Sequence, residues 1–141
     1  MKKKITRRRF VGDVATGMAF TIVPPHVLGA RGRPRLAPSD KLNIACIGVG
    51  GMGATDVRGV AKTENIYALC DVDDRQAAGS FTAFPQAKRF KDFRVMLEKE
   101  GKSIDAVTIS TPDHTHTVAG MAAMKLGKHV RIQKPLARTL W

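Results

Sequence analysis

Three glycines near the middle of the chain have the spacing of a phosphate-binding turn. The stretch GVGGMG places them as Gly48-x-Gly50-x-x-Gly53, directly after the apolar run Leu42–Ile47. The first glycine permits a tight turn, the second lets a diphosphate approach the backbone, and the third lets the next helix pack closely against the sheet. The unpaired N–H groups at the start of that helix favour an anion, so the pattern predicts diphosphate binding.

An aspartate follows these glycines at the distance expected of a ribose-binding carboxylate. Asp71 comes about 20 residues after Gly48, at the end of the apolar run Ile66–Cys70. A carboxylate there accepts hydrogen bonds from ribose hydroxyls and repels a 2′-phosphate, which favours NAD over NADP. Arg75 favours the opposite choice, because a guanidinium can pair with that phosphate. We therefore expect NAD, with NADP as the alternative.

A later stretch, TPDHTH at residues 111–116, combines turn-forming and polar residues. We expect it to lie at the edge of the sheet where such folds bind ligands, with Asp113 capping the helix that follows. His114 and His116 beside Asp113 could suggest a metal site. Residues two apart on a helix point to different faces, and no further ligand cluster is visible, so we expect no metal.

A lysine follows the last apolar run of the chain. Lys134 and Pro135 come directly after the segment His129–Gln133. A lysine in this position can hydrogen-bond a substrate hydroxyl, polarising it or assisting proton transfer. The alternative is a surface lysine that only marks where the chain leaves the sheet.

The residues that could do chemistry are separated by alternating strand-like and helix-like segments. The expected strands are Leu42–Ile47, Ile66–Cys70, Lys88–Phe90, Ala106–Ser110 and His129–Ile132. The expected helices are Met52–Lys62, Arg75–Phe84, one that Asp92 caps and Gly101 ends, and one that runs to Leu126 before Gly127. Strands that alternate with helices predict an α/β fold with a doubly wound parallel sheet, in the strand order 3-2-1-4-5.

The net charge of +12 is concentrated at the beginning of the chain. Residues 1–38 hold nine Lys or Arg and one Asp, whereas residues 39–141 hold fifteen Lys or Arg and eleven Asp or Glu. The positive charge is therefore mainly a property of the first segment, and we expect no nucleic-acid binding. No apolar stretch has the 18 to 20 residues that a stable membrane span needs.

The first 38 residues have the pattern of an export signal. Basic residues precede the mostly apolar segment Val14–Val23, and small residues follow near Ala30. Thr6-Arg7-Arg8-Arg9-Phe10 resembles the twin-arginine signal, so we expect the Tat export machinery as a partner and a periplasmic location. An ordinary secretory signal or a basic arm are the alternatives. We interpret residues 1–38 as signal and linker, and 39–141 as a dinucleotide-binding domain.

The two cysteines, Cys46 and Cys70, each lie within an apolar run. Two thiols form neither a disulfide framework nor a metal-binding spacing. We expect both to be small buried side chains. A bridge between them is left open, on the condition that their strands are neighbours.

Four motifs together resemble one known family. GVGGMG, CDVD, STPDHTH and QKPLARTLW, from Lys41 to the end of the chain, are similar to the N-terminal domain of the glucose–fructose oxidoreductase/inositol dehydrogenase family, Gfo/Idh/MocA. The resemblance implies an NAD(P)-dependent oxidoreductase that acts on sugars, cyclitols or related polyols, with a homo-oligomer as one option. It also implies a Rossmann-type fold, because the N-terminal domain of this family is of that type.

The resemblance also implies a set of site residues. The pyrophosphate ligands would be Gly48, Val49, Gly50, Gly51, Met52 and Gly53. Asp71 would bind the adenine ribose, and Thr111, Pro112 and His116 would lie near the nicotinamide ribose. Lys134 would be the catalytic lysine, near nicotinamide and substrate, and its bond to Pro135 is often cis in the family.

Two features depart from the family pattern. Gln133 replaces the glutamate of the family's Glu-Lys-Pro motif. The family's second α/β domain, which carries most of the substrate pocket, is also not expected within these 141 residues. We therefore expect no turnover from this segment alone, and a non-catalytic dinucleotide-binding module or inactive fragment is the alternative.

Overall fold

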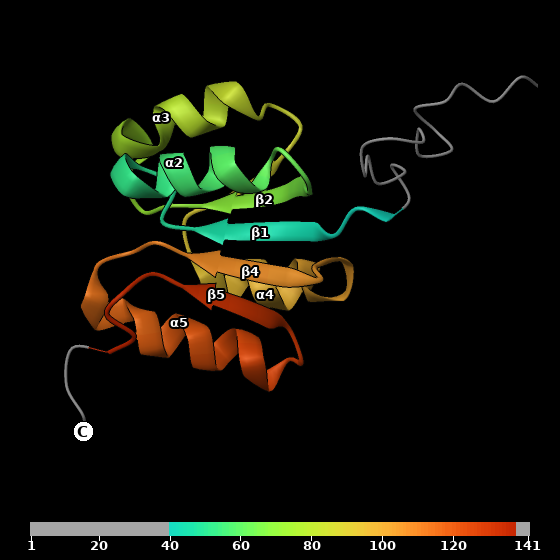
Figure 1. Cartoon of the computed structure of the whole chain (residues 1–141), viewed down its shortest axis with the longest axis vertical. Coiled ribbons are helices and arrows are strands. Elements are labelled where there is room, and N and C mark those ends of the chain that lie inside the picture. The colour runs from blue at the N-terminus through green and yellow to red at the C-terminus, as the bar shows by residue number, and fades with distance from the viewer. Residues whose placement is uncertain (1–39, 138–141) are drawn as a thin grey trace, which may run out of the picture. The chain divides into compact units, whose positions relative to one another are not determined.

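Within residues 40–137, which are those that this computed structural model describes, five parallel strands form one sheet (Figure 1). The strands are β1 (Asn43–Ile47), β2 (Asn65–Cys70), β3 (Lys88–Phe90), β4 (Ala106–Ile109) and β5 (His129–Ile132). Their order is β3-β2-β1-β4-β5, and each neighbouring pair is parallel. The predicted fold class and strand order are confirmed. The predicted export signal at residues 1–38 lies outside the described residues.

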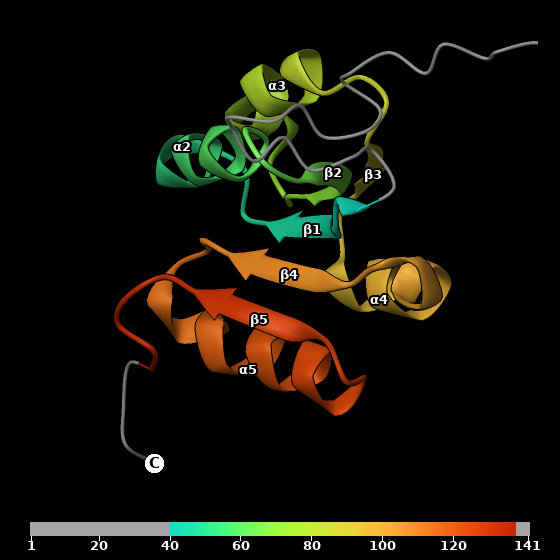
Figure 2. The same cartoon turned by 45° about the vertical axis from the view of Figure 1, so that its right-hand side comes forward.

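Helices connect the successive strands in this part of the chain. They are α2 (Gly51–Val60), α3 (Asp74–Ala83), α4 (Phe93–Glu100) with the short 3-10 turn η2 (Gly101–Ser103), and α5 (Asp113–Lys125). In both views α2 lies beside α3, and α5 lies next to β5 at the other end of the sheet (Figure 1 and Figure 2). None of the helices between residues 40 and 137 is long and apolar enough to cross a membrane.

The central strand β1 is buried on both faces, as its apolar sequence predicts. Ile44 and Cys46 belong to the apolar cluster that α2 and α3 cover. Ala45 and Ile47 belong to the cluster that α4 and α5 cover. Successive side chains of a strand point to opposite faces, so this one run supplies both halves of the core. The residue after Ile47 therefore leaves the sheet from its centre.

The two cysteines lie on neighbouring strands but on opposite faces of the sheet. Cys46 packs in the α2–α3 cluster and Cys70 in the α4–α5 cluster, and both are free thiols. The bridge that the sequence left open therefore does not form. Burial raises the pKa of the Cys46 thiol to about 11 and that of Cys70 to about 12, so both remain neutral core side chains.

Of the predicted helix caps Asp92, Gly101 and Asp113, the first two are confirmed and the third is not. Asp92 caps α4 by accepting a hydrogen bond from Arg94 N at 2.8 Å, as predicted. Gly101 is the C-cap at which α4 ends, as predicted, and its right-handed backbone leads directly into η2. The predicted cap of α5, Asp113, is wrong. Pro112 is the N-cap, and Asp113 lies in the first turn, where its charge still favours the helix dipole.

Candidate functional site

The carboxyl ends of the strands open onto a cleft of about 510 Å³. The arrowheads of β1, β4 and β5 point toward this end of the sheet in Figure 1. The cleft is lined by the turn after β1, by the end of β2 and by the turn after β4. Because β1 leads outward to β2 and β4 leads outward to β5, this is the topological switch point where doubly wound sheets bind ligands.

The turn after β1 has the shape that its glycines predict. Gly48 has φ +75°, and a Cβ there would lie 2.8 Å from the carbonyl carbon of Ser110. A Cβ at Gly53 would overlap the carbonyl oxygen of Gly48, so only glycine lets α2 start this close to β1. Gly50 has a further reason to be glycine, since a Cβ there would lie 2.9 Å from Cβ of Gln76 on α3. The spacing did not reveal this last contact.

The N-terminus of α2 faces the cleft without a capping side chain. Its N-cap residue, Gly50, has no side chain that could accept a hydrogen bond from the helix. The first turn of α2, a helix that the structure describes in full, holds no acidic residue. The N–H groups of Gly51 and Met52 have no acceptor within the helix, because the first turn of any helix lacks them. Gly53 N donates to Gly50 O at 2.8 Å. The N–H groups of Gly51 and Met52 are thus the donors available for an anion.

Asp71 connects the end of β2 to the glycine turn. Its Oδ2 accepts hydrogen bonds from Val49 N at 2.9 Å and Gly50 N at 3.1 Å, and its Oδ1 accepts one from Asp73 N at 3.0 Å. Asp71 also lines the cleft. A carboxylate has about four lone-pair positions, so it keeps capacity for a ligand hydroxyl. These bonds use the N–H groups of Val49 and Gly50, two of the predicted diphosphate ligands.

Two further aspartates and their cation partners lie beyond Asp71. Arg75 pairs with Asp73 through its Nε at 3.3 Å, and Lys91 pairs with Asp74 at 2.7 Å. Hydrogen bonds from the Arg75 side chain and backbone hold the pKa of Asp73 below its ordinary value. The guanidinium that could favour a 2′-phosphate therefore already has a carboxylate partner.

The turn after β4 presents Thr111, Pro112 and His114 to the cleft. His116 does not line it. Its side chain is 2% exposed and lies between two backbone carbonyls, with Nε2 2.7 Å from Thr111 O and Nδ1 2.7 Å from Pro135 O. His116 therefore joins the turn after β4 to the segment after β5. Within residues 40–137, no cluster of three His, Cys, Asp or Glu side chains could hold a metal.

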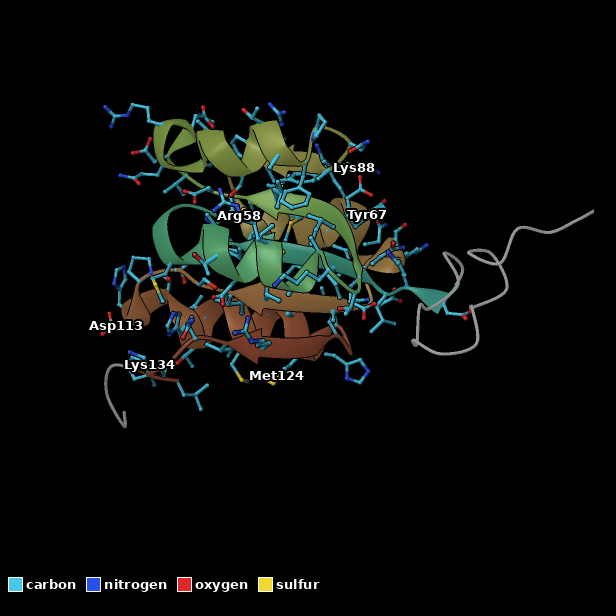
Figure 3. The ribbon with its side chains drawn as sticks, turned by 45° about the horizontal axis from the view of Figure 1, so that its top comes forward. Arg58, Tyr67, Lys88, Asp113, Met124 and Lys134 are labelled. Carbon is cyan, nitrogen blue, oxygen red and sulfur yellow. The ribbon has the colours of Figure 1, made fainter. Side chains whose placement is uncertain are left out.

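Lys134 is exposed and lies outside the lining of the cleft. Figure 3 shows Lys134 and Asp113 at the same end of the ribbon, away from Tyr67. The Lys134–Pro135 bond is cis, as the resemblance predicts. The segment is held against α5 by His116 and by a 3.3 Å hydrogen bond from Thr117 Oγ1 to Leu136 O.

Sequence reasoning missed Asp56, whose carboxylate joins α2 to the ends of β4 and β5 through hydrogen bonds. The Asp56 carboxylate accepts hydrogen bonds from Ser110 Oγ at 2.6 Å, Gln133 Nε2 at 3.1 Å and Arg131 Nη2 at 3.1 Å. Burial opposes its charge, but these donors together outweigh that cost and hold the pKa of Asp56 below its ordinary value. Helical spacing could have pointed to Asp56, because this residue follows Gly53 by three positions and so lies on the same face of α2.

Several cleft-lining side chains were also missed, and three of them lie on the α3 and β3 side of the cleft. They are Gln76 on α3 and Lys91 and Phe93 after β3. The rule that ligands bind beyond the carboxyl ends of parallel strands would have found the last two, had it been applied to β3 as well as to β1, β2 and β4. Their position extends the cleft beyond Asp71.

The arrangement fits a dinucleotide. Gly51 has φ +48° and open space where a Cβ would stand, so the backbone at the start of α2 is accessible from the cleft. An anion-binding helix start and a carboxylate with spare acceptor capacity lie side by side in one elongated cleft. These are the two groups that recognise the diphosphate and ribose of such a ligand.

Comparisons with known proteins agree with this geometry. Residues 42–140 match the family model described as "Oxidoreductase family, NAD-binding Rossmann fold". The chain is 33% identical over 102 residues to inositol 2-dehydrogenase 2 of Saccharopolyspora erythraea, covering 70% of this chain and 29% of that protein. It is also 33% identical over 117 residues to a glycosyl hydrolase family 109 protein of Solibacter usitatus, covering 73% of this chain and 26% of that one.

A solved structure shows the same fold. It is scyllo-inositol dehydrogenase from Lactobacillus casei with bound NAD(H) and scyllo-inositol, with a TM-score of 0.62 and 25% identity over 69% of this chain and 29% of that chain. The chain thus spans less than a third of the length of these relatives. Because the family model covers most of the sequence, the chain belongs to the Gfo/Idh/MocA oxidoreductase family, and its described part is an NAD-binding Rossmann domain.

Proposed function

We propose that this chain is the cofactor-binding domain of a dehydrogenase that oxidises a CH–OH group of a sugar, cyclitol or related polyol. The observation that carries the proposal is the open first turn of α2 beside the carboxylate of Asp71 in one cleft. The similarity to an inositol 2-dehydrogenase supports the substrate class. Because the chain spans 29% of that relative, the substrate-binding part of the enzyme would lie in further sequence.

Different residues would bind different parts of the cofactor. The N–H groups of Gly51 and Met52 would hold the diphosphate, and Asp71 would accept hydrogen bonds from the adenine ribose. Thr111 and Pro112 would lie near the nicotinamide ribose, with His116 supporting them from behind. When bound, NAD⁺ supplies the hydride acceptor for the oxidation.

Lys134 would hydrogen-bond the hydroxyl that is oxidised and assist the loss of its proton. Its place at the carboxyl edge, on a segment tied to α5, supports this role. Lys134 follows β5, which pairs with β4, so it would reach the cleft from the side of the turn after β4, where Thr111 and His114 lie.

The proposed cofactor is NAD rather than NADP. Asp71 and Asp73 place two carboxylates at the ribose end, and a 2′-phosphate would be repelled by them. Arg75, the residue that could offset this repulsion, is paired with Asp73. The charge pattern around the ribose therefore supports rejection of the phosphate.

A calorimetric titration of the purified chain with NAD⁺ and with NADP⁺ tests the proposal. We expect saturable heat and a raised unfolding temperature with NAD⁺, and weaker effects of both kinds with NADP⁺. ADP-ribose should bind as well, because it carries the same diphosphate and adenine ribose. Absence of binding by all three ligands would contradict the proposal.

Glycoside cleavage is a second candidate, favoured by the similarity to a glycosyl hydrolase family 109 protein. The two candidates share the cofactor cleft and differ in the net reaction. Incubating a protein that contains this chain with polyols and with aryl glycosides separates them. Reduction of the NAD⁺ by a polyol, whether the NADH stays bound or is released, indicates a dehydrogenase, whereas release of the aryl group without net reduction of NAD⁺ indicates a glycosidase. Cofactor binding with neither product would favour the non-catalytic module.

We further propose that the protein is exported through the twin-arginine pathway with its cofactor already bound. The motif Thr6-Arg7-Arg8-Arg9-Phe10 supports the pathway. Free dinucleotide is expected to be scarce outside the cytoplasm, so hydride would be returned to a second substrate rather than released as NADH. Protein purified from the periplasm should contain tightly held dinucleotide, and an Arg7→Lys/Arg8→Lys variant should stay in the cytoplasm. An empty, freely exchanging site would overturn the loading step.

A further inference from the structure

Asp56 links three elements that meet at the edge of the cleft. It lies on α2, the helix whose N-terminus faces the cleft, and its side chain is 14% exposed. Its partners are Ser110 at the end of β4, and Arg131 and Gln133 from β5 and the residue after it. One carboxylate therefore fixes the helix of the glycine turn to the two strands that carry the other side of the cleft.

Gln133 stands between Asp56 and the lysine segment. Its Nε2 donates to Asp56 Oδ2 at 3.1 Å, and its Oε1 accepts from the backbone N–H of Lys134 at 3.2 Å. An amide can donate and accept at the same time, whereas a carboxylate can only accept. A glutamate at this position could still accept from Lys134, but it would face Asp56 with a like charge.

We propose that Asp56 and Gln133 form a matched carboxylate–amide pair that positions the Lys134–Pro135 segment beside the cofactor cleft. The proposal rests on the proposed function, because it concerns the lysine assigned to the nicotinamide end. It makes Gln133 a positioning residue rather than a sign of a decayed site. The amide suits this neighbour, because it can donate a hydrogen bond to the Asp56 carboxylate and a glutamate carboxylate could not.

The charged surroundings of the pair define its pH behaviour. Arg131 from β5 faces Asp56 and donates a hydrogen bond to its carboxylate. Cys46 from β1 senses the charge of Asp56, but its pKa of about 11 keeps it neutral below that pH. In Gln133→Glu, the introduced carboxyl group would therefore be the one titrating group added beside Asp56. Two neighbouring carboxyl groups resist being ionised together.

The experiment compares Gln133→Glu, Asp56→Asn and the double variant with the unsubstituted chain. Gln86→Glu is the matched control, because it makes the same change at an exposed turn residue outside the cleft. Affinities for NAD⁺ and ADP-ribose are measured by calorimetry at about pH 8 and about pH 5. ADP-ribose has no nicotinamide, so it reports on the glycine turn and Asp71 without the lysine end.

We expect Gln133→Glu to weaken NAD⁺ binding about tenfold at the higher pH, and ADP-ribose binding less than about twofold. The loss of NAD⁺ affinity should shrink at the lower pH, where the two carboxylates can share a proton. In the double variant the introduced asparagine amide can donate to the introduced carboxylate, so NAD⁺ affinity should recover to within about threefold. Gln86→Glu should bind both ligands as the unsubstituted chain does.

Each other outcome overturns a definite statement. Unchanged NAD⁺ affinity in Gln133→Glu, or no recovery in the double variant, would overturn the matched pair. An equal loss for NAD⁺ and ADP-ribose would show a general destabilisation and would also overturn the positioning role. Absence of NAD⁺ binding by the unsubstituted chain would overturn the proposed function itself, and it would be seen before any variant is compared.

Discussion

The carboxylate of Asp71 accepts a hydrogen bond from the backbone N–H of Gly50 at 3.1 Å. The residue that the sequence assigns to ribose recognition therefore also holds the turn assigned to the diphosphate. We expect this contact to couple the binding of the two halves of the ligand, because a change at Asp71 would alter both the hydroxyl acceptor and the turn.

We expect Asp71→Ser to have two separable effects. Loss of the charge should weaken NAD⁺ binding at least about tenfold and bring the NAD⁺ and NADP⁺ affinities closer together. Loss of the acceptor leaves the N–H groups of Val49 and Gly50 without their partner, which should lower the free energy of unfolding by about 1–3 kcal/mol. Calorimetry with both cofactors and urea denaturation measure the two effects.

Asp71→Asn is the control for that prediction, since it keeps an oxygen acceptor but removes the charge. It should relax the cofactor preference with a smaller loss of stability than Asp71→Ser. An unchanged ratio of NAD⁺ to NADP⁺ affinity in both variants would contradict the role of the charge.

Gly53→Ala should disrupt the cofactor cleft. The added Cβ would overlap the carbonyl oxygen of Gly48, so α2 must move away from the turn, at a cost of about 2 kcal/mol or more in unfolding free energy. NAD⁺ binding should be lost or strongly weakened. Gly59→Ala, on the same helix but with no atom near the added Cβ, should instead raise stability by up to about 1 kcal/mol. Equal effects of the two substitutions would refute this explanation.

The two histidines of the TPDHTH turn should respond differently to replacement by alanine. His116→Ala removes a buried ring and leaves the carbonyls of Thr111 and Pro135 without that partner, which should cost about 2 kcal/mol. His114→Ala should cost less than about 0.5 kcal/mol, because this side chain is 60% exposed. Urea denaturation of both variants measures the two losses of unfolding free energy. A larger loss for His114→Ala would contradict the description of His116 as the buried, hydrogen-bonded histidine.

The buried thiols should make the fold less stable in alkaline solution. The pKa of each thiol is raised above its ordinary value of 9.0, to about 11 for Cys46 and about 12 for Cys70, chiefly by burial. Above pH 9 the folded chain therefore keeps thiol protons that the unfolded chain releases. The contribution of the neutral thiols to the free energy of unfolding is complete below pH 9 and is lost as the pH rises toward 11 and 12. A Cys46→Ala/Cys70→Ala variant should show a shallower decline of unfolding free energy above pH 9.

Thiol reagents give an independent measurement of the same burial. At about pH 8 the folded chain should react slowly at both cysteines, and denaturant should release two fast-reacting thiols. Rapid reaction of the folded chain would show that one of the thiols is accessible, contrary to the packing described above.

Local sequence patterns were sufficient to predict the strands and helices, and the part of the site that the glycine turn and Asp71 form. The apolar run before Gly48 is buried on both faces, which only a central strand of a covered sheet requires. The glycine spacing and Asp71 mark the carboxyl ends of β1 and β2, and neighbouring parallel strands bring those ends together. These features are encoded within one strand–turn–helix unit and the strand that follows it, so a linear pattern reveals them.

Only the tertiary structure decided which distant residues support that site. Asp56 and Gln133 are 77 residues apart in sequence, and they meet because β4 pairs with β1 and β5 pairs with β4 at one side of the sheet. His116 of α5 reaches Pro135, and Gln76 approaches Gly50 because α3 packs beside α2. Strand and helix propensities act over a few neighbouring residues, whereas these contacts depend on how the helical crossovers stack the strands. The sequence by itself therefore determined a dinucleotide-binding Rossmann fold, and packing determined which side chains hold the cleft in shape.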